Sequence, residues 1–186
     1  MPHAHKAVTV QGVVQVLRTL GYLDDILARV TPGTKAVLEQ PHSKRFHPGT
    51  ALDETYTTLA ATRGNEEVER VMALATEGSL KGIIAPLARL FMTMMGGGPR
   101  ALLERFETLI SGGTQGFTAR WDAIGPTEGT LSIGTDDAMP PVADHAWKGA
   151  VAYLLRFAEV EGTVDITPRA AQTQEVRLRV KWTPKK

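Results

Sequence analysis

The sequence predicts an α+β fold in which a helical N-terminal part packs on a four-stranded antiparallel sheet with β-β-α-β-β C-terminal order. Two patterns predict it. Up to about Ser111, apolar residues recur every three or four positions, which is the spacing of amphipathic helices. Beyond Ser111 they recur every second position, on either side of one further helical segment, which is typical of strands that bury one face.

The helical part is predicted to contain several separate helices. Helical spacing covers residues 12–20, 23–30, 50–64 and 65–78. A short additional helix is expected between Thr31 and Pro41, where a Thr-Pro start and a proline stop bracket it. Asn65 is a good N-cap, and the acids that follow it suit the positive end of a helix.

The longest apolar helix is predicted over residues 79–95, with a kink at Pro86. The glycines that follow, in GGGPR (96–100), could suggest a phosphate-binding loop. Such a loop needs a preceding strand and a Lys-Ser/Thr pair, and Pro99 lacks an N–H donor. We therefore interpret this stretch as a connector to a helix over residues 99–110.

The C-terminal part alternates apolar and polar residues in four segments. Strands are predicted at residues 117–123, 129–134, 162–168 and 175–182, with a helix over 136–160 between the second and third. The last strand alternates most regularly. Trp182 and its alternate neighbours face inward, and Arg177, Arg179 and Lys181 face outward.

The length of 186 residues predicts a single domain over residues 1–186. We divide it into an N-terminal segment (1–10), a helical part (11–111) and a strand–helix–strand part (112–186). The N-terminal segment is expected to be partly flexible because chain ends are usually mobile.

Composition narrows the classes of function. The net charge of +1 gives no general attraction for nucleic acid, and the absence of cysteine excludes disulfides and thiolate metal sites. No apolar run reaches the ~18 residues of a membrane span, so we expect no membrane span and a cytoplasmic location.

Two groups of polar residues are candidates for an anion or partner contact. His42, Arg45 and His47 share one loop, which could equally be a solvated loop or an enzyme site of unrecognised type. Arg177, Arg179 and Lys181 share one strand face, where the alternative role is protection of an edge strand. Nucleic acid is disfavoured as a partner because this face carries no aromatic residue for base stacking.

The remaining titratable residues give weaker signals. His3 and His5 are expected in a disordered tail, with loose metal binding as the alternative. Asp136 and Asp137 are expected to cap the long helix. His145 is the one histidine considered as a haem ligand, but its position falls off the apolar face of that helix.

Several short stretches resemble a known family in order and spacing. They are VTVQG, RFHPG, EGSLKGIIAPLARLFM, GGGPRALLERF and the closing VKW. In these the chain resembles a myxobacterial paralogous family of unknown function, a domain-of-unknown-function group. It is also similar to a superfamily that includes vinyl-reductase-like domains, vesicle-tethering TRAPP subunits and haem-NO-binding domains. The resemblance implies a ligand-binding or dimerising fold. Many vinyl-reductase-like relatives carry histidine and cysteine in the last hairpin, and residues 164–182 contain neither.

These observations lead to a main hypothesis and two alternatives. The main hypothesis is a non-catalytic cytoplasmic regulatory module that binds a small apolar ligand or a signalling protein partner, as a homodimer. Its predicted ligand-binding residues are Phe91, Met94, Met95, Trp147 and Leu154. No cofactor and no metal is predicted, and haem is disfavoured. The alternatives are a haem- or gas-sensing domain and an enzyme with a site near His42–His47.

Overall fold

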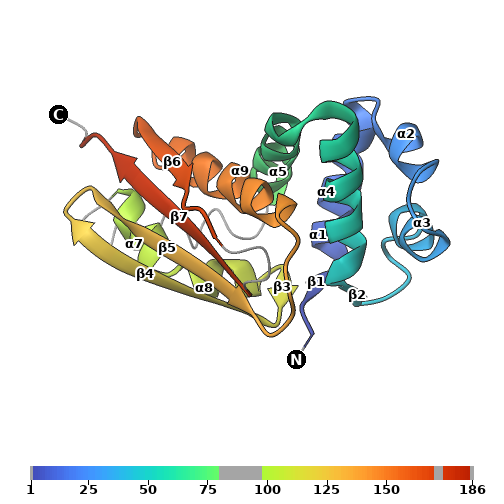
Figure 1. Cartoon of the computed structure of the whole chain (residues 1–186), viewed down its shortest axis with the longest axis horizontal. Helices are drawn as coiled ribbons and strands as arrows, with labels where there is room; N and C mark the ends of the chain where they lie inside the picture. The colour runs from blue at the N-terminus through green and yellow to red at the C-terminus, as the bar shows by residue number, and fades with distance from the viewer. Residues whose placement is uncertain (1, 80–97, 170–173, 185–186) are drawn as a thin grey trace.

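The computed structural model describes residues 2–79, 98–169 and 174–184. It has a helical layer on one side and a sheet on the other, with one long helix between them (Figure 1). The helix predicted over residues 79–95, with its kink at Pro86, lies outside the described residues except for Ser79.

Five helices make up the described helical layer. They are α1 (Ala7–Thr19), α2 (Leu23–Leu27), α3 (Pro32–Glu39), α4 (Gly49–Arg63) and α5 (Asn65–Ser79). Their apolar faces meet in one core, in which Val13, Leu17 and Leu59 are fully buried. The residues that recur with helical spacing in the sequence therefore form the buried faces of these helices.

The predicted four-stranded antiparallel sheet is confirmed. Its strands are β4 (Phe117–Gly125), β5 (Glu128–Thr135), β6 (Gly162–Ile166) and β7 (Glu175–Trp182), in the spatial order β4-β5-β7-β6. In β7, Val176, Leu178 and Val180 are fully buried, and Trp182 is 9% exposed. This face packs on α9 (Val142–Phe157), which completes the predicted order of the C-terminal part.

Several of the predicted helices have different bounds in the structure. The helix expected over 12–20 already begins at Ala7, and the one expected over 23–30 ends at Leu27. The segment expected at 99–110 consists of α7 (Pro99–Glu104) and α8 (Phe106–Ser111). The backbone of Arg105, with φ −110° and ψ 16°, leaves helical geometry between them. The helix expected over 136–160 begins only at Val142, because Pro140 and Pro141 precede it and proline is tolerated only at a helix start.

A second, smaller sheet was not predicted. It joins β1 (Ala4–Lys6), β2 (Phe46–Pro48) and β3 (Thr114–Gln115), with β1 in the centre and antiparallel to both neighbours. Within the N-terminal segment expected to be partly flexible, residues 4–6 form β1 and residues 7–10 form the first turn of α1. Strands of two or three residues are too short for alternation to reveal them.

Helix α9 packs closely against α5, and Gly149 permits this. A Cβ atom at Gly149 would lie only 2.2 Å from the carbonyl oxygen of Glu69 in α5. Since backbone atoms cannot move aside as side chains do, a larger residue here would push the two helices apart.

We predict that Gly149→Ala lowers the free energy of unfolding by about 1–3 kcal/mol, the usual cost of overpacking. Gly78→Ala is the matched control, because Gly78 also lies in a helix but has no atom within 4 Å of the added methyl group. The control should be neutral or stabilise by up to about 1 kcal/mol. Urea unfolding of the two variants measures both effects, and equal stability of Gly149→Ala and wild type would contradict the packing argument.

Candidate functional site

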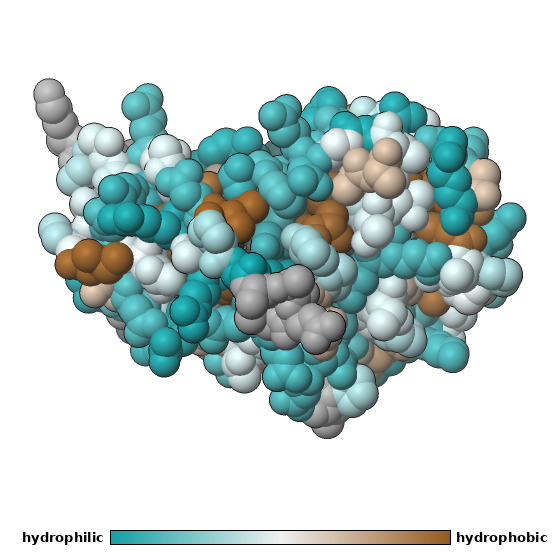
Figure 2. Space-filling view, in the orientation of Figure 1, coloured by the Kyte–Doolittle hydropathy of each residue, from teal (hydrophilic) through white to brown (hydrophobic). Residues whose placement is uncertain are grey.

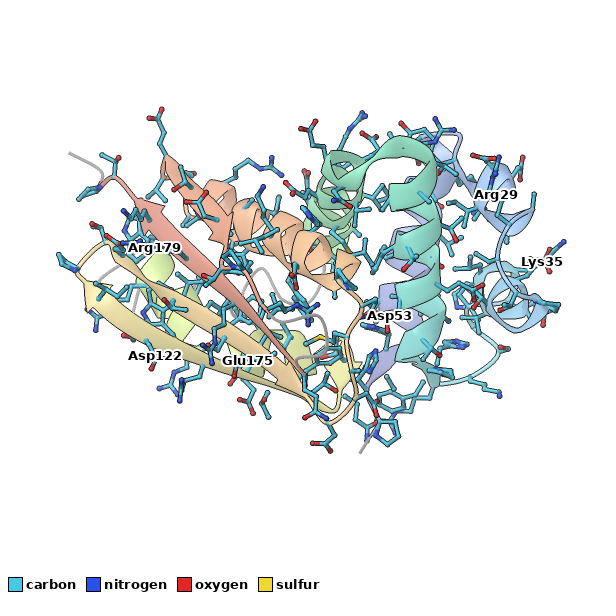
Figure 3. The ribbon with its side chains drawn as sticks, viewed as in Figure 1. Arg29, Lys35, Asp53, Asp122, Glu175 and Arg179 are labelled. Carbon is cyan, nitrogen blue, oxygen red and sulfur yellow. The ribbon has the colours of Figure 1, made fainter. Side chains whose placement is uncertain are left out.

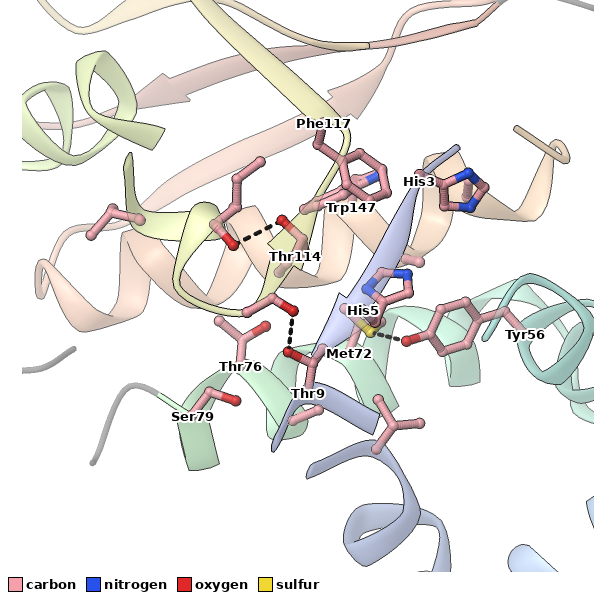
Figure 4. A pocket seen from close by; sticks show the side chains of 18 of the residues that line it. His3, His5, Thr9, Tyr56, Met72, Thr76, Ser79, Thr114, Phe117 and Trp147 are labelled. Atoms are coloured by element: carbon pink, nitrogen blue, oxygen red, sulfur yellow. Dashed lines mark hydrogen bonds between the residues drawn. The ribbon is translucent and has the colours of Figure 1, made fainter. Parts of the chain in front are cut away.

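A cavity of about 140 Å³ lies between the helical layer and the sheet. Strand β1 and helices α1, α4 and α5 form one side of it, and α8, β4 and α9 form the other. Figure 4 shows the side chains that surround it. Most of the lining is apolar, so the cavity suits an apolar body with few polar contacts.

Small residues keep this space open. On α9, Ala143, Ala146 and Ala150 are spaced by three or four residues and therefore share the face that lines the cavity. Ala75 of α5 lines it from the other side. The larger side chains of Trp147 and Leu154 complete the same face of α9.

His5, from the centre of β1, is the most unusual residue of the lining. It is only 9% exposed, and its Nδ1 atom has no hydrogen-bond partner among the described residues. Burial, followed by the nearby positive charge of His3, lowers the pKa of His5 to about 3. The ring is therefore neutral at physiological pH, and it offers a nitrogen at the wall of an apolar cavity.

His3 links the two layers. Its Nε2 lies 3.1 Å from Asp53 Oδ2 on α4, and its Nδ1 lies 3.2 Å from Asp137 Oδ2 on the segment between β5 and α9. The backbone N–H of His3 also donates to Asp137, at 2.8 Å. The hydrogen bond with Asp53 raises the pKa of His3 despite its burial, and Asp137 acts in the same direction. We call these three residues the His3 clamp.

The His3 clamp explains two features of the surrounding chain. Neither Asp136 nor Asp137 caps α9, whose N-cap is Pro141 without a side-chain hydrogen bond. The backbone and side chain of His3 hold Asp137 instead, and this lowers the pKa of the Asp137 carboxyl. Gly49 makes room for the His3 ring, because a Cβ atom there would lie 1.8 Å from a ring carbon.

Hydroxyl groups lie at other points of the cavity wall. The hydroxyl of Tyr56 donates to the sulfur of Met72, at 2.8 Å, and burial raises the pKa of Tyr56. Thr9 donates to the carbonyl of Gly113. Thr76 and Ser79 of α5 lie on the opposite side of the cavity from His3 (Figure 4).

The predicted ligand-binding residues fall into two groups. Trp147 and Leu154 line the cavity, and the Trp147 ring makes edge contacts with the rings of Phe106 and Phe117. Phe91, Met94 and Met95 lie outside the described residues.

The loop with His42, Arg45 and His47 does not form one site. His47 is buried, and its Nε2 lies 2.8 Å from the carbonyl of Pro41. It lines a separate polar cleft beside α3 and α4, whose described lining includes neither His42 nor Arg45. Arg45 lies over the ring of Phe46 instead.

The three cations of β7 are on the outer face of the sheet and are ion-paired. Arg179 and Lys181 approach Glu128 of β5, at 2.7 and 3.3 Å, and Arg177 pairs with Glu175. Figure 3 shows Arg179 and Glu175 on this strand. Their charges are largely balanced by these neighbours.

His145, the histidine considered as a haem ligand, does not line the cavity. Its Nδ1 lies 2.7 Å from Glu69, which also pairs with Lys148. This agrees with its predicted position off the apolar face of the helix. The sequence analysis placed His3 and His5 in a disordered tail. They lie on either side of Ala4 in the stretch PHAH, and only the recognition of a short buried strand there could have distinguished them from a tail.

Within the described ranges, no group of three or more His, Cys, Asp or Glu residues could hold a metal ion. The His3 clamp does not do so because its two carboxylates bond to opposite nitrogens of the ring. No helix of the described chain has the length and apolar character of a membrane span.

The chain belongs to the family described as "Protein of unknown function (DUF2378)", which it matches over residues 8–183. No protein of curated function matches it. Its fold is similar to that of solved H-NOX proteins. The Fe(II) unliganded H-NOX protein from K. algicida aligns with a TM-score of 0.72 and 9% identity, over 97% of each chain. An oxygen-binding H-NOX domain related to soluble guanylate cyclases aligns at 0.62 and 13% identity, over 96% of this chain and 95% of that domain.

These similarities establish the fold and correct two expectations. The main hypothesis was wrong; it was a non-catalytic module for a small apolar ligand or a protein partner. The expectation of no cofactor, with haem disfavoured, was also wrong. They are overturned because the similar structures are H-NOX proteins, one described as oxygen binding. The alternative of a haem- or gas-sensing domain is the one these neighbours favour.

We predict that His5 makes the protein less stable at low pH. The unfolded chain takes up a proton near pH 6.5 while folded His5 stays neutral down to about pH 3, so stability falls across that window. The slope is up to about 1.4 kcal/mol for each pH unit. His5→Phe should flatten this part of the curve of unfolding free energy against pH, whereas His42→Gln, in an exposed loop, should leave it unchanged. An unaltered slope in His5→Phe would refute the burial of a neutral ring.

His3 should act in a different pH window. Its pKa is raised in the folded state, so its contribution is complete below pH 6.5 and is lost as the pH rises through the folded pKa. We expect wild-type stability to decline above pH 6.5, and His3→Gln to be less stable at pH 6 with a shallower decline. Denaturant titrations from pH 6 to pH 9 measure both curves, and parallel curves would argue against the His3 clamp.

Proposed function

We propose that this protein is a haem-based sensor of a small gas molecule, with haem bound between the helical layer and the sheet. One observation carries the proposal. His5 presents a neutral, buried ring at the wall of an apolar cavity, with a nitrogen that has no partner among the residues that the structure describes. An H-NOX-like fold over nearly the whole chain supports it.

The cavity contains a residue that could hold haem iron. Haem iron in proteins is held by histidine, cysteine, methionine or tyrosine. A neutral imidazole is the form that binds a metal, and low pKa keeps His5 in that form. His5 is therefore the residue that would hold the iron, and bound haem would supply a reversible binding site for a diatomic gas.

Two features of the cavity set conditions for this binding. The cavity of about 140 Å³ is close to the ~150 Å³ that holds benzene and below the ~300–1,000 Å³ of typical ligand sites. Haem is larger than this space, so its binding would require the cavity to widen. The described lining contains no lysine or arginine, and its polar groups include the hydroxyls of Thr76 and Ser79.

The chain's own residues would link the cavity to the rest of the molecule. His3 bonds to α4 on one layer and to the segment before α9 on the other. Phe117 makes ring contacts with His3, His5 and Trp147. A change in the separation of the layers would thus alter the His3 clamp and the aromatic contacts together.

We also propose a regulatory, non-enzymatic role, in which the ligand-bound form acts on a signalling partner. A cytoplasmic location is part of this proposal. The absence of cysteine supports it, because that composition suits a reducing compartment.

Haem titration of the purified full chain tests the proposal. We expect a saturable Soret band at one haem per chain. His5→Ala should lose the band, or shift it, and added imidazole should restore the wild-type spectrum by replacing the missing ring. His145→Ala is the matched control and should bind as wild type does, because His145 does not line the cavity.

Circular dichroism of His5→Ala distinguishes a lost ligand from a lost fold. The absence of a saturable band in the wild type would refute haem binding. A spectrum unchanged by His5→Ala would refute His5 as the ligand.

A further inference from the structure

Within the described residues, strand β4 is an edge of the four-stranded sheet, and Glu107 of α8 reaches it at Ala119. The strand spans nine residues, and within the described chain only β5 pairs with it. Proline or lysine usually protects a long edge strand against pairing with another chain, and β4 contains neither. Its β-bulge lies only at the end, between Ala123 and Gly125.

The direction of the free backbone groups follows from one hydrogen bond. The N–H of Ala119 donates to the carboxylate of Glu107 in α8, at 3.1 Å, and therefore points away from β5. Because backbone groups alternate along a strand, the N–H groups of Trp121 and Ala123 point the same way. Neither of these two has a hydrogen-bond partner within the described residues.

The side chains of this strand provide a charge pattern on its solvent face. Arg120 and Asp122 are exposed, at 72% and 53%, and lie 2.9 Å apart. They flank Trp121 symmetrically in the sequence. A strand with this pattern is complementary to an antiparallel copy of itself.

We propose that two copies of this chain pair through β4, antiparallel, about a twofold axis at Trp121. Arg120 then lies opposite Asp122 of the second copy, and the reverse pair forms by symmetry. Each Trp121 exchanges backbone hydrogen bonds with its counterpart, and the N–H of Ala123 reaches the carbonyl of Ala119 in the second copy. In this pairing the N–H of Ala119 moves from the carboxylate of Glu107 to the carbonyl of Ala123 in the second copy.

The charges select this register against its neighbours. A shift of the pairing by one step in either direction keeps the backbone groups facing each other. It places Arg120 opposite the second Arg120, or Asp122 opposite the second Asp122. Like charges directly opposite each other are destabilising. Only the register about Trp121 pairs opposite charges on both sides.

An exposed apolar residue lies next to the same edge. The sheet face in Figure 2 is mostly hydrophilic, with an apolar group at the outer end of the β4–β5 hairpin. Ile124, 63% exposed, is in this part of β4. Pairing of two β4 strands brings Ile124 close to the second copy. The contact is small, so the dimer should dissociate on dilution.

Sedimentation velocity over a range of concentrations tests the proposal, with wild type expected to dimerise reversibly. Arg120→Asp and Asp122→Arg should each weaken the dimer about tenfold, because each creates two like-charge pairs. The double variant R120D/D122R should restore wild-type association, because it rebuilds both pairs with reversed signs. Arg177→Asp, on the same sheet face but on β7, should have no effect.

The substituted side chains are exposed, and circular dichroism checks that each variant folds. A wild type that stays monomeric at every concentration would overturn the proposal. So would a dimer that the single reversals leave intact, or a double variant that does not recover. None of these outcomes depends on whether the cavity binds haem.

Discussion

The insertion of β1 between the two layers is the constraint on which the rest of the structure depends. This three-residue strand pairs with β2 and β3, which come from distant parts of the chain. His5 in this strand and His3 just before it both line the cavity; the carboxylate partners of His3 raise its pKa, and burial lowers the pKa of His5. Two histidines separated by one residue therefore have opposite electrostatic roles, because their surroundings differ and not their chemistry.

This arrangement explains how the two layers pack firmly and still leave a cavity between them. The two layers each have their own apolar core, and close packing at Gly149 holds α5 against α9. Between them, a face of alanines leaves a space that nothing in the described chain fills. A buried ring nitrogen without a partner costs stability, about 1–3 kcal/mol for a typical polar group. A bound metal centre would supply the missing partner, and this gives the haem proposal its physical basis.

Much of the fold was predictable from sequence, and the centre of the site was not. The alternation of β7 and the apolar faces of α1 and α5 are local patterns, and they were predicted. The contact between His3 and Asp137 joins residues 134 positions apart, and no local pattern reports it. Strand β1 is too short to alternate visibly, so His5 was assigned to a tail. His145 was expected to fall off the apolar face of its helix, and its ring pairs with Glu69 and does not line the cavity.

The most direct test of this account is the protonation state of His5. NMR titration of the ring nitrogens in ¹⁵N-histidine-labelled protein, with His5→Phe used to assign the signal, follows each histidine separately. The account predicts that His5 remains neutral from pH 8 down to at least pH 5, while His3 titrates above the ordinary value of 6.5. A His5 ring that takes up its proton near pH 6.5 would show that the strand is not buried in an apolar cavity, and would contradict the account.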